Sequence, residues 1–149
     1  MNILVITSIP AIEPPIFQSP VIIHAIIKVS REAVGSKKSL KSNKKNYQMD
    51  FSNSKEALRE VALDISEGAD FVMVKPGMPY LDVIKLIKDN FKIPVFAYQV
   101  SGEYSLIKNG INNKILNENA IYESLMSFKR AGASAVVTYF ADQIADKLG

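Results

Sequence analysis

The chain has 149 residues, a formal net charge of +3 and a hydrophobic fraction of 48%, values typical of one globular domain. It contains no cysteine, which excludes disulfides and thiolate metal sites within this sequence. No apolar run reaches the roughly 18 residues of a membrane span, so we expect no membrane partner.

Residues 1–30 are apolar and interrupted by prolines, and they form the least regular part of the sequence. Residues 2–7 are predicted to form a buried strand, and residues 21–29 a strand or a short helix. Residues 31–46 are polar and favour a loop that holds a group of lysines: Lys37, Lys38, Lys41, Lys44 and Lys45. Without interleaved aromatic residues this group favours a solvated loop over a nucleic-acid site.

From residue 53 onward, apolar residues recur with alternating helical and strand character. Predicted helices cover residues 53–67, 79–90, 101–108, 118–131 and 141–148. Predicted strands cover residues 71–74, 94–100 and 134–138. Gly68 and Gly132 are expected to end helices, and Asn109-Gly110 is expected to form a turn. This alternation indicates an α/β fold with a parallel sheet and right-handed crossovers.

Each predicted strand ends at a polar side chain, namely Lys75, Ser101 and Tyr139. The carboxyl ends of parallel strands meet at one edge of a sheet, where working residues collect. Apolar neighbours favour the neutral amine of Lys75, which can attack a carbonyl to form a Schiff base. Position alone also fits a lysine that extends into water, a serine that caps a helix and a tyrosine that bonds to a neighbour.

Several local sequences resemble porphobilinogen synthases (delta-aminolevulinic acid dehydratases). Residues 73–82, Met-Val-Lys-Pro-Gly-Met-Pro-Tyr-Leu-Asp, resemble the segment around the Schiff-base lysine of that family. Residues 97–104, 129–133 and 138–141 resemble the next strand and the last helix–strand corner, and residues 31–33 and 47–50 resemble the flanks of an active-site lid. The resemblance covers residues 31–149 in family order.

This resemblance implies a TIM (β/α)8 barrel, of which residues 51–149 would be roughly the last three βα units and residues 31–50 the lid. Residues 1–30 match no part of the family and stay unassigned. It implies a cytoplasmic lyase that condenses two molecules of 5-aminolevulinate into porphobilinogen for haem biosynthesis. It further implies a homo-octamer, or an upstream fragment as partner, and no organic cofactor.

The resemblance also assigns roles to individual residues. Lys75 would form the Schiff base, while Ser101 and Tyr139 would bind the carboxylate of the same substrate. Arg31 would bind the carboxylate of the other substrate molecule, and Lys44 and Gln48 would be further lid contacts. The family usually has arginine at the place of Lys44, and lysine loses its bidentate geometry. Glu60 would bind an allosteric magnesium ion, whereas the family's catalytic zinc site falls outside this sequence.

Some features expected of the family are missing from this sequence. A barrel needs eight βα units and typically about 250 residues. A second catalytic lysine, expected about ten residues before Arg31, falls at Val21. The sequence therefore predicts a truncated enzyme, with two alternatives left open: a non-catalytic remnant of a broken gene, or a small α/β binding module.

Overall fold

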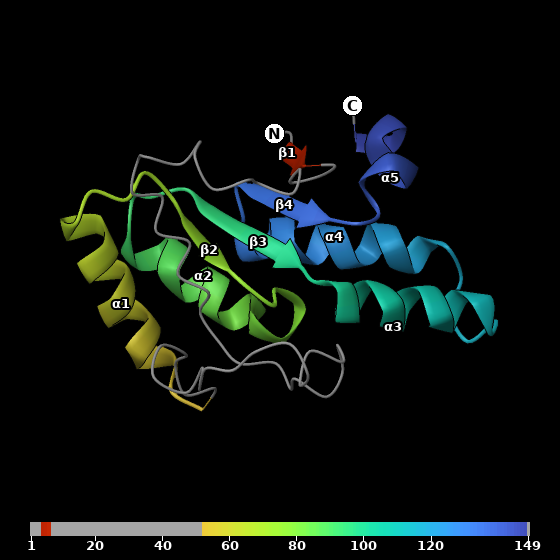
Figure 1. Cartoon of the computed structure of the whole chain (residues 1–149), viewed down its shortest axis with the longest axis horizontal. Helices are drawn as coiled ribbons and strands as arrows, with labels where there is room; N and C mark the ends of the chain where they lie inside the picture. Colours follow the sequence, from red (N-terminus) through yellow and green to blue (C-terminus); the bar gives the residue numbers. More distant parts are fainter. Residues whose placement is uncertain (1–3, 7–51, 149) are drawn as a thin grey trace, which may run out of the picture.

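The computed structural model describes residues 4–6 and 52–148, which form a parallel sheet with helices (Figure 1). The strands are β1 (Leu4–Ile6), β2 (Val72–Val74), β3 (Val95–Gln99) and β4 (Ala135–Thr138). The α-helices are α1 (Ser54–Ser66), α2 (Leu81–Asn90), α3 (Ser101–Asn112), α4 (Asn119–Ala131) and α5 (Ala141–Leu148). The predicted segments 21–29 and 31–46 lie outside the described residues.

The described sheet has the strand order β1-β4-β3-β2, and all three strand pairs are parallel. The three strands predicted between residues 71 and 138 are confirmed, and the strand predicted within residues 2–7 is present as β1. The predicted α/β class with a parallel sheet is thereby confirmed. Leu4–Ile6 pair with Ala135–Val137 of β4, so β1 is an outer strand of the described sheet and covers the side of β4.

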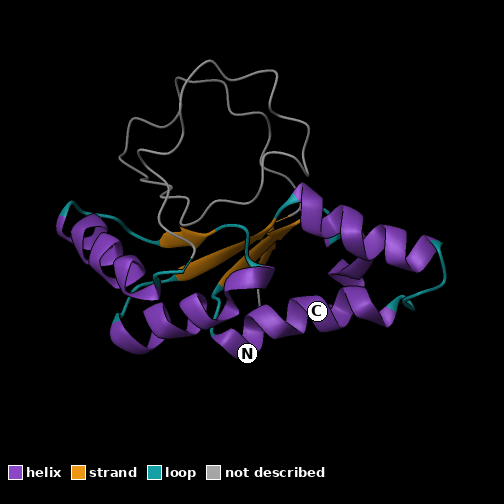
Figure 2. Cartoon of the chain, turned by 90° about the horizontal axis from the view of Figure 1, so that it is seen from below, coloured by secondary structure: helices purple, strands orange, loops and turns teal. Residues whose placement is uncertain are grey.

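Helices α2 and α4 lie on one face of the sheet, which Figure 2 shows nearly edge-on, and α1 packs beside α2. Alternation along the strands turns every second side chain toward this face. These strand residues join apolar side chains of α1, α2 and α4 in one core: Val61, Val72, Val74, Ile84, Ile87, Val95, Ala97, Leu125, Phe128 and Val136. Each fully buried side chain of this size contributes roughly 1.5–3 kcal/mol, which makes this core the main support of the strand ends.

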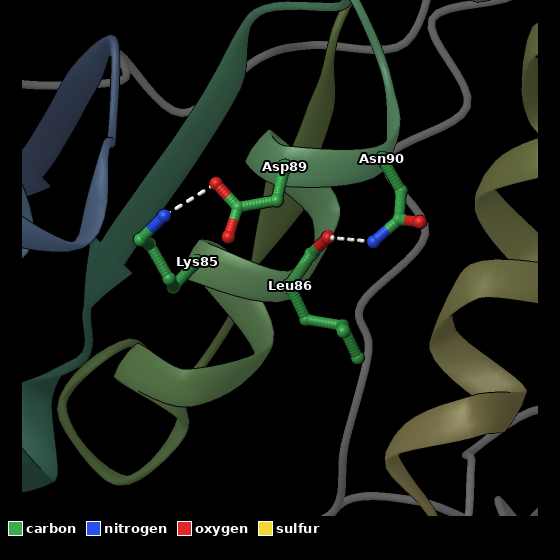
Figure 3. Close-up of polar contacts among 4 residues, drawn as sticks. All are labelled: Lys85, Leu86, Asp89 and Asn90. Atoms are coloured by element: carbon green, nitrogen blue, oxygen red, sulfur yellow. Dashed lines mark hydrogen bonds and ion pairs between the residues drawn. The ribbon is translucent and has the colours of Figure 1, made fainter.

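Local sequence explains where two of the helices end. Gly68 and Gly132 follow α1 and α4 with φ angles of +96° and +100°, a conformation that glycine adopts without steric cost. Both predicted stops are confirmed. The outer face of α2 has polar contacts one turn apart: Lys85 pairs with Asp89, and the Asn90 amide donates to the Leu86 carbonyl at 2.8 Å (Figure 3).

Two predicted helix boundaries are wrong. The helix predicted from residue 79 begins as a 3-10 turn over Met78–Tyr80, and α2 starts only at Leu81. The helix predicted for residues 101–108 continues through Asn109-Gly110 to Asn112. Gly110 leaves room for Leu116 rather than forming the turn, because an added Cβ would lie 2.7 Å from the Leu116 Cδ1 atom.

The chain turns instead at residues 113–117, where Lys114 has a φ of 59°. The backbone N–H groups of Ile115 and Leu116 both donate to the Gly110 carbonyl, at 2.9 and 3.0 Å. In Figure 1, α3 continues beyond the end of β3 and is joined to α4 at its far end. Within residues 52–148, no helix combines the length and apolar character that a bilayer crossing requires.

Candidate active-site edge of the sheet

The strand register brings the three strand-end residues to neighbouring positions. Val74 of β2 pairs with Ala97 of β3, so continuing this register by one residue places Lys75 beside Tyr98. Tyr98 in turn pairs with Val137 of β4, two residues before Tyr139. Ser101 begins α3 directly after β3. The three residues therefore follow the carboxyl ends of adjacent strands, and these ends form the edge of the sheet described below, as the sequence predicts.

These positions differ in exposure. Lys75 is half-buried at the end of a strand whose three residues are all buried. Ser101 is exposed, and 53% of Tyr139 is accessible to solvent. This edge of the sheet thus offers a half-buried lysine and two exposed residues that carry hydroxyl groups.

Tyr98 adds a second phenol, which the sequence motif contains but which chain position alone does not single out. Its hydroxyl lies 3.1 Å from the Tyr139 hydroxyl, and the two ring centroids are 6.4 Å apart. Burial and then the hydrogen bond with Tyr139 raise the pKa of Tyr98 to about 12. Tyr98 therefore stays neutral near pH 7. In such a pair one hydroxyl donates to the other, which leaves one O–H to donate to a ligand.

Tyr104 of α3 completes this aromatic group. Its ring packs 5.6 Å from the Tyr139 ring and 4.5 Å from the Phe140 ring, measured between centroids. The ring planes are tilted by 53° and 47°, and contacts between rings at these separations stabilise the packed arrangement. The Tyr139 hydroxyl is thus oriented by β3 through Tyr98 and by α3 through Tyr104.

A buried polar network lies beneath this edge, on the helix side of the sheet. Thr138 donates its hydroxyl to Gln99 Oε1 at 2.5 Å and accepts the Phe140 N–H at 3.1 Å. The Gln99 amide nitrogen lies 3.1 Å from Ser124 Oγ. This network joins the ends of β3 and β4 to α4. A satisfied buried network of this kind favours one arrangement of the groups above it.

The loop that follows Lys75 is held at several points. Gly77 donates its N–H to the Tyr98 carbonyl at 2.8 Å, and Met78 donates its N–H to Glu103 Oε1 at 2.7 Å. Gly77 also lies against the Phe128 ring, so closely that an added Cβ would be 2.4 Å from Cε1. Glu103 is a site residue that sequence reasoning missed, because its partners are backbone N–H groups and one of them is 25 residues away.

Glu60 lies apart from this edge, on α1, at the opposite side of the structure from α3 in Figure 1. It is half-buried. In the described parts of the chain, no group of three or more His, Cys, Asp or Glu side chains could hold a metal ion. The lid residues predicted to bind substrate, Arg31, Lys44 and Gln48, lie outside the described residues.

The arrangement suits one kind of ligand. A half-buried amine can react with a ketone, while hydroxyl groups can donate hydrogen bonds to an anion. A small keto acid presents both functions. This edge of the sheet can therefore hold such a molecule by a covalent bond at Lys75 and by hydrogen bonds from Ser101 and Tyr139.

The sequence is similar to those of known delta-aminolevulinic acid dehydratases. The delta-aminolevulinic acid dehydratase family model matches residues 27–147. Dehydratases from Bradyrhizobium diazoefficiens and Archaeoglobus fulgidus are 60% and 54% identical over 119 and 106 residues, or 79% and 71% of this chain. They are matched over 34% and 33% of their own length. The chain thus spans about a third of these relatives.

The fold is also similar to that of a solved member of this family. Delta-aminolevulinic acid dehydratase from Toxoplasma gondii, determined with the reaction product porphobilinogen, superimposes with a TM-score of 0.71 and 49% identity. The superposition covers 78% of this chain and 34% of that protein. The family match leaves out residues 1–26 and begins four residues before residue 31, where the resemblance was expected to begin. By both sequence and structure, this chain belongs to the delta-aminolevulinic acid dehydratase family.

Proposed function

We propose that this chain carries the Schiff-base part of a porphobilinogen synthase, in which Lys75 binds 5-aminolevulinate covalently. The observation that carries the proposal is a half-buried Lys75 directly after Val74, which pairs with Ala97 of β3, in a chain of this family. The lysine amine attacks the ketone of 5-aminolevulinate, the carbinolamine loses water, and a C=N bond joins substrate and lysine. The substrate carboxylate accepts hydrogen bonds from Ser101 and Tyr139.

The remaining roles follow the family resemblance. Residues 31–50 form the lid, in which Arg31, Lys44 and Gln48 contact the substrate. Residues 51–149 form the last three βα units of an aldolase-type TIM barrel. The observed parallel strands β2, β3 and β4 with their crossover helices support this assignment. The other barrel units come from an upstream fragment.

Magnesium binding at Glu60 is the metal assignment that we propose. Mg²⁺ commonly takes one or two carboxylates and keeps several waters, so a single half-buried glutamate on a helix suits it. The ion stabilises α1 and performs no step of the reaction. Magnesium should raise the thermal unfolding temperature of the natural chain and should have a smaller effect on Glu60→Gln. An equal rise in both proteins would contradict this assignment.

Reductive trapping tests the proposed function. The full chain is incubated with 5-aminolevulinate and borohydride, and the modified residue is located by peptide mass spectrometry. We expect one adduct, located at Lys75, and none in Lys75→Met. Lys92, an exposed lysine in the loop before β3, provides the matched control, because Lys92→Met should leave the adduct unchanged. Absence of an adduct, or modification spread evenly over the lysines, would refute the proposed function.

A non-catalytic remnant is the second candidate, favoured by Val21 at the position where the family resemblance leads us to expect a second catalytic lysine. It differs from the first candidate in one measurable property. A remnant that has lost its site would fold without reacting at Lys75, whereas the site described above reacts selectively with the substrate ketone.

A further inference from the structure

Glu103 occupies an unusual position between the two segments that carry the proposed reactive groups. One carboxylate oxygen, Oε1, accepts the Met78 N–H at 2.7 Å, and the other, Oε2, accepts the Val100 N–H at 2.6 Å. Met78 lies three residues after Lys75, and Val100 directly precedes Ser101. One side chain thus connects the loop after β2 to the turn between β3 and α3.

A second hydrogen bond strengthens the same connection. The Gly77 N–H donates to the Tyr98 carbonyl at 2.8 Å, so two successive residues of the loop bond to the β3–α3 segment. Because Lys75 is separated from Gly77 by a single proline, its backbone has little freedom once these bonds form. The Glu103 bonds therefore hold the backbone segment after Lys75 against the backbone segment before Ser101.

Partial burial makes the charged form of the Glu103 carboxylate less favourable. Burial raises its pKa above the ordinary glutamate range, and the backbone N–H groups of Met78, Val100 and Gly77 offset only part of this effect. Burying a charge costs free energy that hydrogen bonds recover incompletely. The bond to the Val100 N–H is the capping-box bond of an N3 glutamate, whereas the bond to the Met78 N–H reaches outside α3. The carboxylate offers one oxygen to each donor, and a glutamine side chain would replace one of these oxygens with an NH2 group.

We propose that Glu103 is a positioning residue that sets the Lys75 amine and the Ser101 hydroxyl at the separation needed to bind both ends of one substrate molecule. The inference rests on the proposed function, because it assigns Glu103 to the same site. Glu103 itself touches no substrate. It acts through the backbone of the two segments, so its loss should affect the rate at which the imine forms more than the folding of the chain.

The test compares Glu103→Gln with Glu123→Gln, a matched control that removes the same charge from an exposed position on α4. Borohydride trapping over a range of 5-aminolevulinate concentrations gives a maximal rate and an apparent binding constant for each full-length protein. We expect the maximal rate in Glu103→Gln to fall by about tenfold to a hundredfold, as for other small displacements of reacting groups. Glu123→Gln should trap at the natural rate. All rates are expressed per folded molecule, from circular dichroism.

A second measurement needs no substrate. Acetic anhydride labels lysine amines, and mass spectrometry gives the extent of labelling at Lys75 relative to the exposed Lys92. Loosening of the loop in Glu103→Gln should bring the Lys75 labelling severalfold closer to that of Lys92. If no protein forms an adduct but Lys75 labelling still rises in Glu103→Gln, the proposed function is refuted. Glu103 would then still hold the loop that carries Lys75. An unchanged trapping rate in Glu103→Gln would refute the positioning role and keep the proposed function.

Stability must be separated from positioning. If the rate falls only in proportion to the unfolded fraction, Glu103 is structural and the inference is wrong. If Glu103→Gln does not fold, Glu103→Asp replaces it, because aspartate keeps the charge but reaches one methylene less far. Aspartate should then give a reduced maximal rate in a folded chain. Failure of both variants to fold would reduce Glu103 to a stabilising residue and overturn the proposal.

Discussion

Gly77 shows how closely the loop after Lys75 is packed. A Cβ at this position would lie 2.4 and 2.9 Å from ring atoms of Phe128, which is fully buried, and 3.3 Å from the Tyr98 carbonyl oxygen. The ring has no room to withdraw within a close-packed core. Gly77→Ala should therefore destabilise the chain by about 1–3 kcal/mol, the usual cost of overpacking, and should displace the loop that carries Lys75.

Gly102→Ala is the matched control for this prediction. No atom lies within 4 Å of an added Cβ at Gly102, and its position in the first turn of α3 is compatible with alanine. Alanine there should leave stability unchanged or raise it by about 0.4–1 kcal/mol, because it restricts the unfolded chain. Urea unfolding followed by circular dichroism measures both variants. Equal stabilities for the two alanine variants would show that Phe128 does not restrict Gly77.

The residues of the site differ in how well the sequence reveals them. Lys75, Ser101 and Tyr139 follow apolar runs, and the rule that parallel strands end at one edge brings them together without any structure. Glu103 gives no such signal, since its bonds go to backbone N–H groups that every residue except proline has. The pairing of Tyr98 with Tyr139 depends on strand register, which the sequence of each strand does not specify alone.

At the scale of elements, regular periodicity and strong stop signals led to correct predictions. The segments that became α1 and α4 each have an apolar stripe and a following glycine at positive φ. The end of α3 was predicted incorrectly, because Asn109-Gly110 is typical of a turn when only neighbouring residues are considered. Packing of Leu116 against Gly110 is a tertiary contact, and it outweighs that local preference.

β1 is the element that the family match does not account for. Leu4–Ile6 precede the matched residues 27–147, and yet they form a parallel pair with Ala135–Val137 of β4. An uncovered strand edge presents free N–H and C=O groups that favour pairing with other chains. We infer that this short N-terminal strand protects the edge of β4.

A proline in β1 tests this protective role. Val5→Pro fixes φ and removes an N–H donor, whereas Val5→Thr keeps both the donor and a β-branched side chain. We expect amides of residues 135–138 to exchange faster in Val5→Pro than in the natural chain, and Val5→Pro to associate at lower concentration. Val5→Thr should resemble the natural chain in both respects. Unchanged amide exchange in Val5→Pro would show that β4 does not depend on β1.

At the scale of the whole molecule, the described sheet corresponds to only part of the barrel expected for the family. The matched region is about a third of each relative, and the family resemblance places the second catalytic lysine upstream of Arg31, where this chain has Val21. Forming an adduct requires only the groups around Lys75. Closing the pyrrole ring of porphobilinogen requires a second substrate and the groups that bind it. The two activities should therefore separate.

Complementation tests this separation. The full chain alone should form the Lys75 adduct but release no porphobilinogen. Addition of the N-terminal two thirds of the Bradyrhizobium diazoefficiens relative, ending where the match begins, should supply the missing barrel units and restore measurable pyrrole formation. Lys75→Met with the same fragment should form none, which ties the restored activity to this chain. Product formation by the chain alone would contradict the prediction. An adduct-forming chain that never yields product with the fragment would show that residues 1–26, or the substitution at Lys44, prevent a productive barrel.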